Sequence, residues 1–217
     1  MKTLSKKDCV TVLDLLLAAY PEAGCALIHS DSFELLVKVV LSAQTTDRSV
    51  NAVSPELFGR YPDAASLAEA DEEDLQRILR RIGMYRTKAR NIKALAASLL
   101  AVHGGVVPDD FDALVALPGV GRKTANVMLA VGFGRQRIAV DTHVFRVANR
   151  IGLCDEKDVL KTETALMKRL PENRWAEAHH SLIFHGRGCC RARGPSCGIC
   201  PTRGYCGYAA SLSPIAP

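Results

Sequence analysis

The sequence predicts an all-α protein of about ten short helices. Ala and Leu are abundant, while aromatic residues make up only 6% of the 217 residues, a balance that favours helices over sheets. Residues that commonly cap helices precede most of the apolar segments, and no segment is a convincing strand. Hydrophobic residues account for 48% of the chain, enough to form the core of one large domain or two small ones.

Caps mark the helices expected in the first half of the chain. Ser5 and Asp31 are N-cap residues, each followed by an apolar segment. Residues 33–41 are apolar nearly all round, so we expect this helix at the centre of the fold. Gly104 suits the position after a helix C-terminus. The predicted elements are a helix from Ser5 to just before Pro21, a helix capped by Asp31-Ser32, a helix from a cap at Asp47 to about Arg60, a turn at Asp63–Ala70, a helix from Asp71 to Ile82-Gly83 and a helix at Thr87–His103.

Candidate N-cap residues also mark helices expected in the second half of the chain. Asp141 and Asp158 each precede a periodic segment and are expected to open a helix. After His185 the chain is rich in Gly, Arg, Pro and Cys, and we expect its end, SLSPIAP, to lack regular structure. The predicted helices are Phe111–Ala116, Arg122–Val131, Asp141–Arg150, Asp158–Leu170 and Trp175–Phe184.

Composition and charge indicate which broad class of protein this is. No apolar run approaches the roughly 20 residues of a membrane-spanning helix, so none is expected. The N-terminal residues MKTLSKKDC lack the long apolar segment of a signal peptide, so we expect a soluble intracellular protein. The net charge of +5 is mild, but residues 186–206 contain four arginines and no acid.

Residues 117–125, with the sequence LPGVGRKTA, form a glycine turn that leads into a helix. Gly119 and Gly121 suit a turn that needs positive φ and close backbone approach, and Pro118 fixes the entry. We predict a helix-hairpin-helix whose backbone N–H groups bind DNA phosphates without reading sequence. By themselves these residues are more typical of an ordinary αα-hairpin.

Lys123 lies in the first turn of the helix that follows, where the helix dipole disfavours a cation. A solvated surface lysine is the default interpretation. In a cleft, however, an amine beside the positive end of a helix loses its proton more easily and becomes a nucleophile for a sugar C1′, giving a Schiff base. Asp141 is expected to cap the helix that follows it, whether or not it is also catalytic. His143 is either a core residue or a DNA contact, and the sequence leaves both open.

The eight cysteines are unevenly placed. The spacing Cys190-x6-Cys197-x2-Cys200-x5-Cys206 puts four thiols within one loop, where they can surround one tetrahedral or cubane metal centre. Spacing alone favours zinc, and disulfides are a poor alternative for an intracellular protein. Cys189 is adjacent to a ligand and is expected to be spare. The arginines around this loop make it a second candidate phosphate contact.

Together, LPGVGRKTA, VDTHVFRV, HGR and the four-cysteine pattern closely resemble the bacterial endonuclease III family of DNA glycosylases with abasic-site lyase activity. The resemblance extends from about Phe33 to Cys206. It implies a six-helix barrel domain over residues 25–135, a second domain formed by residues 1–24 and 136–217, and an active site in the cleft between them. In that family the four cysteines hold a 4Fe–4S cluster, which overturns the preference for zinc.

The resemblance also implies roles for single residues. Lys123 matches the nucleophile and Asp141 its acid/base partner. Gln44 matches the residue that enters the space left by a flipped base, and Met84 occupies the second wedge position, which is usually Leu in relatives. The hairpin residues that match are Leu117, Gly119, Val120 and Gly121, and further DNA contacts are expected from His143, Arg187 and Arg191.

The implied activity is removal of oxidised pyrimidines from duplex DNA, followed by β-elimination 3′ to the abasic site through a lysine Schiff base. The expected partner is duplex DNA with damaged pyrimidines or abasic sites, bound by a monomeric, cytoplasmic, nucleoid-associated protein without membrane contact. One alternative is a monofunctional mismatch glycosylase, although such relatives generally lack a lysine at position 123. A second is a non-enzymatic helix-hairpin-helix module with a structural metal, which needs neither Lys123 nor Asp141.

Overall fold

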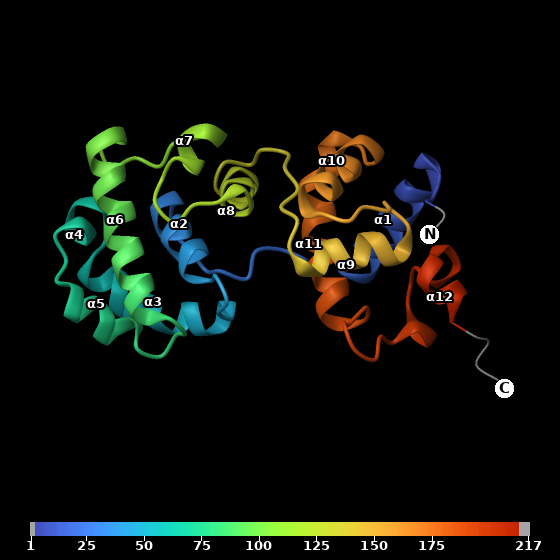
Figure 1. Cartoon of the computed structure of the whole chain (residues 1–217), viewed down its shortest axis with the longest axis horizontal. Coiled ribbons are helices and arrows are strands. Elements are labelled where there is room, and N and C mark those ends of the chain that lie inside the picture. The colour runs from blue at the N-terminus through green and yellow to red at the C-terminus, as the bar shows by residue number, and fades with distance from the viewer. Residues whose placement is uncertain (1–2, 213–217) are drawn as a thin grey trace. The chain divides into compact units, whose positions relative to one another are not determined.

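A computed structural model describes residues 3–212, and every regular element in that range is helical, which confirms the predicted fold class (Figure 1). The chain forms two compact units. The middle unit spans residues 25–135, and the outer unit combines the described residues up to Gly24 with those from Gln136 onward. Within the described range, no helix combines the length and the apolar character needed to cross a lipid bilayer.

The middle unit is built around α2 (Ser32–Leu41). Leu35, Leu36 and Leu41 of this helix are completely buried, as its nearly continuous apolar sequence predicted. Helices α3, α6 and α8 pack against α2. The elements of this unit after α2 are α3 (Asp47–Arg60), α4 (Ala64–Ala68), α5 (Glu72–Leu79), α6 (Tyr85–His103), α7 (Phe111–Val115), α8 (Arg122–Val127) and a π-helical turn, η1 (Met128–Gly132).

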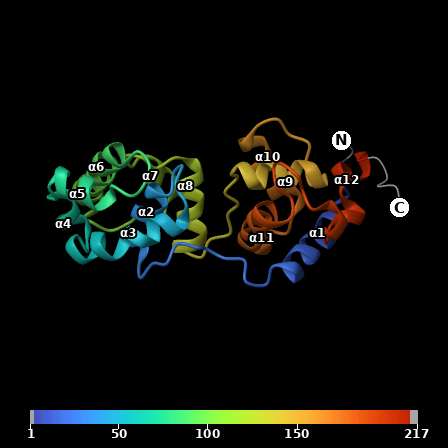
Figure 2. The same ribbon diagram turned by 90° about the horizontal axis from the view of Figure 1, so that it is seen from below.

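The outer unit is assembled from both ends of the chain. Helix α1 (Lys6–Ala19) packs beside α11 (Trp175–Gly188), as Figures 1 and 2 both show. Their shared core includes Leu13 and Leu16 from α1 and Leu182 from α11. The other elements are α9 (Thr142–Ile151), α10 (Val159–Arg169), η2 (Glu172–Arg174), η3 (Cys197–Ile199), η4 (Arg203–Tyr205) and α12 (Gly207–Ser211).

Side-chain caps set most helix starts, as predicted. The Ser5 hydroxyl accepts a hydrogen bond from the backbone N–H of Asp8 at 3.1 Å, and the Asp31 carboxylate accepts one from Glu34 at 2.8 Å. The predicted cap at Asp47 is one residue late. Thr46 is the N-cap, since its hydroxyl accepts from the N–H of Ser49, and Asp47 is instead the first helical residue.

The predicted helix ends were less accurate. Helix α5 ends at Leu79, not at Ile82-Gly83, because the chain enters tight turns after Arg80 and reverses through a left-handed residue at Met84. The helix before the cysteine loop continues to Gly188 and does not stop at Phe184. A further helix, α12, was not predicted; it takes in Ser211, and residues 213–217 of the SLSPIAP segment lie outside the described range.

Gly186 lies within α11, at a position where any side chain would collide with α9. A Cβ atom at this position would lie 2.9 Å from Cβ of His143 and 3.1 Å from Cγ2 of Val147. The first distance is shorter than real Cβ contacts, and neither atom is the free end of a flexible side chain. The glycine therefore allows two helices to approach closely, and it does not mark the end of a helix.

We expect Gly186→Ala to lower the free energy of unfolding by about 1–3 kcal/mol, because the added methyl group overpacks the contact between α9 and α11. The matched control is Gly188→Ala in the same helix, where an added Cβ meets nothing within 4 Å. Denaturant unfolding compares the two variants. Equal stability of the two variants would contradict the proposed close approach.

Candidate functional site

The glycine turn connects α7 to α8 in the middle unit. Gly119 has φ +78°, a left-handed conformation that favours glycine, and a Cβ there would lie 3.4 Å from Cγ1 of Val40. Gly121 differs from the prediction: its φ is −97°, the extended conformation usual for the N-cap of a helix. Leu117 and Val120 are buried and anchor the turn, so only their backbone groups are available to a ligand.

Lys123 is exposed in the first turn of α8, directly after this turn. The neighbouring Arg122 lies over the ring of Phe111, with 5.1 Å between the guanidinium carbon and the ring centroid. The region therefore combines the N-terminus of a helix, whose first N–H groups have no acceptor within the helix, with cationic side chains. Such an arrangement suits an anionic ligand.

Gln44 and Met84 have an unusual backbone. They are the two non-glycine residues with positive φ within residues 3–212, at 53° and 57°. Both side chains are exposed, that of Met84 by 51%. The two turns are neighbours, because a Cβ on Gly83 would lie 4.0 Å from the carbonyl oxygen of Gln44. Left-handed conformations cost about 1–2 kcal/mol for such residues, and this kind of strain is concentrated at functional sites.

Lys88 was not recognised from the sequence, because nothing local separates it from the other cations of α6. Its side chain is only 3% exposed, and its ammonium group donates a hydrogen bond to the hydroxyl of Thr45, next to Gln44. Burial lowers the pKa of Lys88 below its ordinary value of 10.5. Lys88 thus connects the turn at Gln44 to the helix that begins after Met84.

Asp141 belongs to the outer unit, where it is the N-cap of α9 as predicted. Its Oδ1 accepts hydrogen bonds from the N–H groups of His143 and Val144, both at 2.8 Å. These two bonds leave Oδ2 for another partner. His143 is half-buried and packs against Gly186, with Nδ1 3.2 Å from a guanidinium nitrogen of Arg146.

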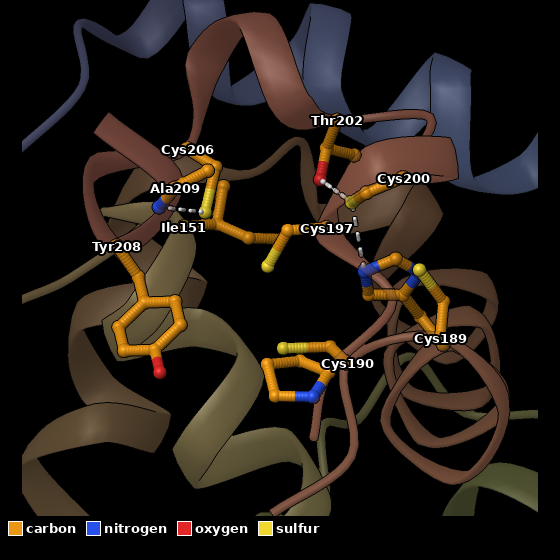
Figure 3. Close-up of a pocket in the computed structure, with 11 residues that line it drawn as sticks. Ile151, Cys189, Cys190, Cys197, Cys200, Thr202, Cys206, Tyr208 and Ala209 are labelled. Atoms are coloured by element: carbon orange, nitrogen blue, oxygen red, sulfur yellow. Dashed lines mark hydrogen bonds between the residues drawn. The ribbon is translucent and has the colours of Figure 1, made fainter. Parts of the chain in front are cut away.

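The five clustered cysteines line one pocket in the outer unit. Figure 3 shows the sulfur atoms of Cys190, Cys197, Cys200 and Cys206 around a common space. All eight cysteines lie in the described range and all are free, so the disulfide alternative fails. Thiolate sulfur is a preferred ligand of both zinc and iron–sulfur centres. The pocket is therefore a possible metal site.

Helix α9 holds the loop that carries these cysteines. The guanidinium of Arg150 donates to the carbonyl of Arg191 at 2.7 Å and to the sulfur of Cys190 at 3.7 Å. Arg146 donates to the carbonyl of Cys190 at 3.1 Å. The sulfur of Cys206 accepts from the N–H of Ala209 at 3.4 Å. The loop is thus fixed by hydrogen bonds to its backbone and to two sulfur atoms.

Cys200 and Cys189 differ in their acidity. Burial opposes ionisation of Cys200, but hydrogen bonds from His185 and Thr202 outweigh it and lower the pKa of this thiol to about 7. Burial and the neighbouring Cys200 raise the pKa of Cys189 to about 12. Possible metal-binding atoms of His185, Cys189 and Cys200 lie within 4.8 Å of one another. The close group therefore includes Cys189, which was expected to be spare, and His185, which the sequence did not single out as a ligand.

Arg187 and Arg191 are both exposed, on the last turn of α11 and on the following loop. Arg191 donates to the carbonyl of Gly194 at 3.2 Å. This segment of the outer unit therefore presents positive charge on its surface.

Comparisons with known proteins agree on one family. Residues 37–172 match the HhH-GPD family, described as a superfamily of base excision DNA repair proteins. The chain is 47% identical over 204 residues to endonuclease III of Bacillus subtilis (strain 168), which covers 94% of this chain and 93% of the relative. It is 43% identical over 205 residues to endonuclease III of Escherichia coli (strain K12), covering 94% and 97% of the two chains.

Solved structures give the same result. A trapped endonuclease III–DNA covalent intermediate superposes with a TM-score of 0.91 at 45% identity, covering 96% of this chain and 98% of that one. A non-covalent endonuclease III–DNA complex gives the same values. A thermostable thymine-DNA glycosylase shares the fold at 21% identity, with a TM-score of 0.86 and coverage of 95% and 98%.

The lowered pKa of Lys88 predicts a pH dependence of stability. When pH rises toward 10.5, the folded chain loses this proton before the unfolded chain does, so the cost of burying the charge disappears and the folded state gains stability. Relative to Lys88→Met, the wild-type protein should therefore gain free energy of unfolding as pH rises. Denaturant titrations across a pH series measure this difference.

The matched control for this series is Lys157→Met, which changes an exposed lysine of the outer unit. Its stability should follow that of the wild type at every pH. Parallel curves for Lys88→Met and the wild type would show that Lys88 is not buried as described.

Proposed function

We propose, because this chain belongs to the endonuclease III family of the HhH-GPD superfamily, that it excises oxidised pyrimidines from duplex DNA and then cleaves the strand at the abasic site. The chain is a base-excision DNA glycosylase and abasic-site lyase. The observation that carries the proposal is an exposed lysine, Lys123, at the start of the helix that follows the glycine turn. A covalent protein–DNA intermediate has been trapped for a structural relative.

DNA binding in this proposal begins at the turn. Gly119 takes its left-handed conformation above α2, and the buried side chains of Leu117 and Val120 hold the turn in place. Backbone N–H groups at the N-terminus of α8 then donate to a phosphate of the DNA backbone. Because such contacts carry no sequence information, they suit an enzyme that must act at any position along the duplex.

The chemistry assigned to Lys123 is nucleophilic. Its unprotonated amine forms a bond to C1′ while the bond between C1′ and the base breaks, and the base leaves with a proton. The C1′–O4′ bond then breaks, the remaining amine proton passes to O4′, and an imine forms between C1′ and nitrogen. Removal of a C2′ proton forms a C2′–C3′ double bond and breaks the C3′–O bond, so the strand on the 3′ side leaves with its 5′ phosphate; this step is β-elimination.

Asp141 is the proposed acid/base partner. Its Oδ1 is occupied by the α9 cap, whereas Oδ2 can accept a proton from the reacting groups and stabilise positive charge on the sugar. The cap fixes the orientation of the carboxylate, so the same bonds that start α9 would also position the reactive oxygen.

Gln44 and Met84 are the proposed wedge. Extruding a nucleotide costs a few kcal/mol of stacking and pairing, least for a damaged base. Exposed side chains on two adjacent left-handed turns can enter the space that the nucleotide leaves. Met84 is unbranched and polarisable, so it adapts to an irregular gap. We assign to this pair the stabilisation of the extruded state.

Cys190, Cys197, Cys200 and Cys206 are the proposed ligands of a 4Fe–4S cluster. The residues fit this group, since their sulfurs line one pocket and none is in a disulfide. Bonds from these four sulfurs to a cluster would cross-link the loop. Arg187 and Arg191, beside that loop, are then proposed to contact DNA phosphates.

Borohydride trapping tests the nucleophile. Reduction of the imine should cross-link wild-type protein to a duplex with an abasic site and to one with an oxidised pyrimidine, but not to undamaged DNA. Lys123→Ala should abolish the cross-link, because the attacking nitrogen is lost, while the exposed-lysine control Lys157→Ala should retain it. Trapping of Lys123→Ala at the wild-type level would disprove the assignment.

The substitution Asp141→Asn tests the acid/base role of this residue separately from its role as an N-cap. Asn is as good an N-cap as Asp, so the thermal midpoint should change little. Loss of the carboxylate should reduce single-turnover base release by about 10²–10⁴-fold, the usual contribution of a general acid/base. A variant that retains the wild-type rate would exclude this role for Asp141.

A further inference from the structure

His185 lines the cysteine pocket, and each of its two ring nitrogens lies close to another side chain. It lies on α11 and is completely buried. Its Nδ1 is 3.0 Å from the hydroxyl of Tyr20, and its Nε2 is 3.6 Å from the sulfur of Cys200. The rings of Tyr20 and His185 meet edge to face, with centroids 5.7 Å apart. Tyr20 is the C-cap of α1, so its contact with His185 joins the N-terminal segment to the cysteine loop.

Counting donors and acceptors selects one of the two tautomers of the neutral ring. A neutral imidazole has one N–H donor and one acceptor nitrogen. A cysteine that ligates a metal is a thiolate and can only accept. If Nε2 carries the hydrogen, it donates to Cys200, and Nδ1 accepts from the Tyr20 hydroxyl. In the other tautomer the Nε2 lone pair would face the thiolate, and that contact would be repulsive.

We infer that Tyr20 and His185 are positioning residues for the metal centre: Tyr20 donates to Nδ1 and so holds the His185 ring in place, and His185 donates its Nε2 hydrogen to the sulfur of Cys200. The inference rests on the 4Fe–4S cluster of the proposed function. The surroundings support it, because Thr202 approaches the same sulfur at 3.3 Å, so Cys200 lies between two possible donors (Figure 3). Cys206 instead accepts from a backbone N–H.

A hydrogen bond to a ligand sulfur favours the more reduced state of a cluster, because the donor stabilises the additional negative charge. Removing the hydroxyl of Tyr20 takes away the donor to Nδ1, so the ring is held less firmly and its Nε2–H donates less strongly to the sulfur. The reduction potential should then fall, although the described hydrogen bond of the Tyr20 hydroxyl goes to His185 and not to a proposed ligand cysteine. This effect from a residue outside the loop distinguishes positioning from packing.

The test uses the full-length protein with its cluster, purified without oxygen. Voltammetry gives the reduction potential, and iron and sulfide assays give the cluster content. Tyr20→Phe should shift the potential to a more negative value at an unchanged cluster content. The control is Tyr208→Phe, which removes a hydroxyl from another ring of the same pocket; this hydroxyl makes no hydrogen bond to a cysteine in the described range. That variant should keep the wild-type potential.

Two substitutions of His185 isolate the tautomer. The amide of His185→Gln reaches the position of Nε2 and donates without tautomers, so it should keep a potential near that of the wild type. The shorter His185→Asn cannot reach the sulfur and should match Tyr20→Phe. Adding Tyr20→Phe to His185→Gln should produce no further shift, whereas a full additive shift would show that Tyr20 does not act through His185 and would overturn the inference.

The possible failures are distinguishable. Wild-type protein without iron and sulfide would exclude the proposed cluster itself. Iron-loaded Tyr20→Phe with the wild-type potential, even with a lower thermal midpoint, would overturn the inference and leave Tyr20 a packing residue. If Tyr20→Phe does not retain the cluster, the comparison of His185→Gln with His185→Asn decides: equal potentials of these two variants would also overturn it.

Discussion

The outer unit depends on the close approach of α9 and α11 at Gly186. The missing side chain lets His143 and Val147 pack directly against the backbone of α11. At this distance Arg146 reaches the carbonyls of both Gly186, at 2.9 Å, and Cys190. Helix α9 therefore carries Asp141 at its start and fixes the cysteine loop from its later turns. A looser contact would disturb both.

The middle unit meets a different constraint, since it must hold two strained turns on its surface. Gln44 and Met84 are exposed, so their own packing cannot maintain left-handed backbones. These turns are supported instead by the buried helix α2 and by Lys88, which connects the two turns. A buried ammonium is a poor way to gain stability, because desolvation opposes its charge. Its place beside Gln44 and Met84, the proposed wedge, favours a functional reason for its presence.

The sequence predicted helix starts well and helix ends poorly, for a physical reason. A start at Ser5 or Asp31 depends on one side chain and an N–H three residues later, so it is local. The end of α5 depends on tight turns that lead to a left-handed residue, and α11 continues through a close contact with α9; periodicity contains neither feature. The same limit applies to the sites. Cysteine spacing identified the loop, but Tyr20 contacts His185 across 165 residues of sequence.

Asp141 shows how structural and chemical roles can coincide in one side chain. The ordinary structural role of an Asp before a helix is that of an N-cap, and the hydrogen bonds of Asp141 agree with this role. Both of those bonds end on Oδ1, so the cap orients the carboxylate without using its second oxygen. A catalytic oxygen must be held in place while remaining free to react, and a one-oxygen cap satisfies both requirements. The structural interpretation of Asp141 therefore does not compete with the proposed catalytic one, because the cap would supply the rigidity that the proposed chemistry needs.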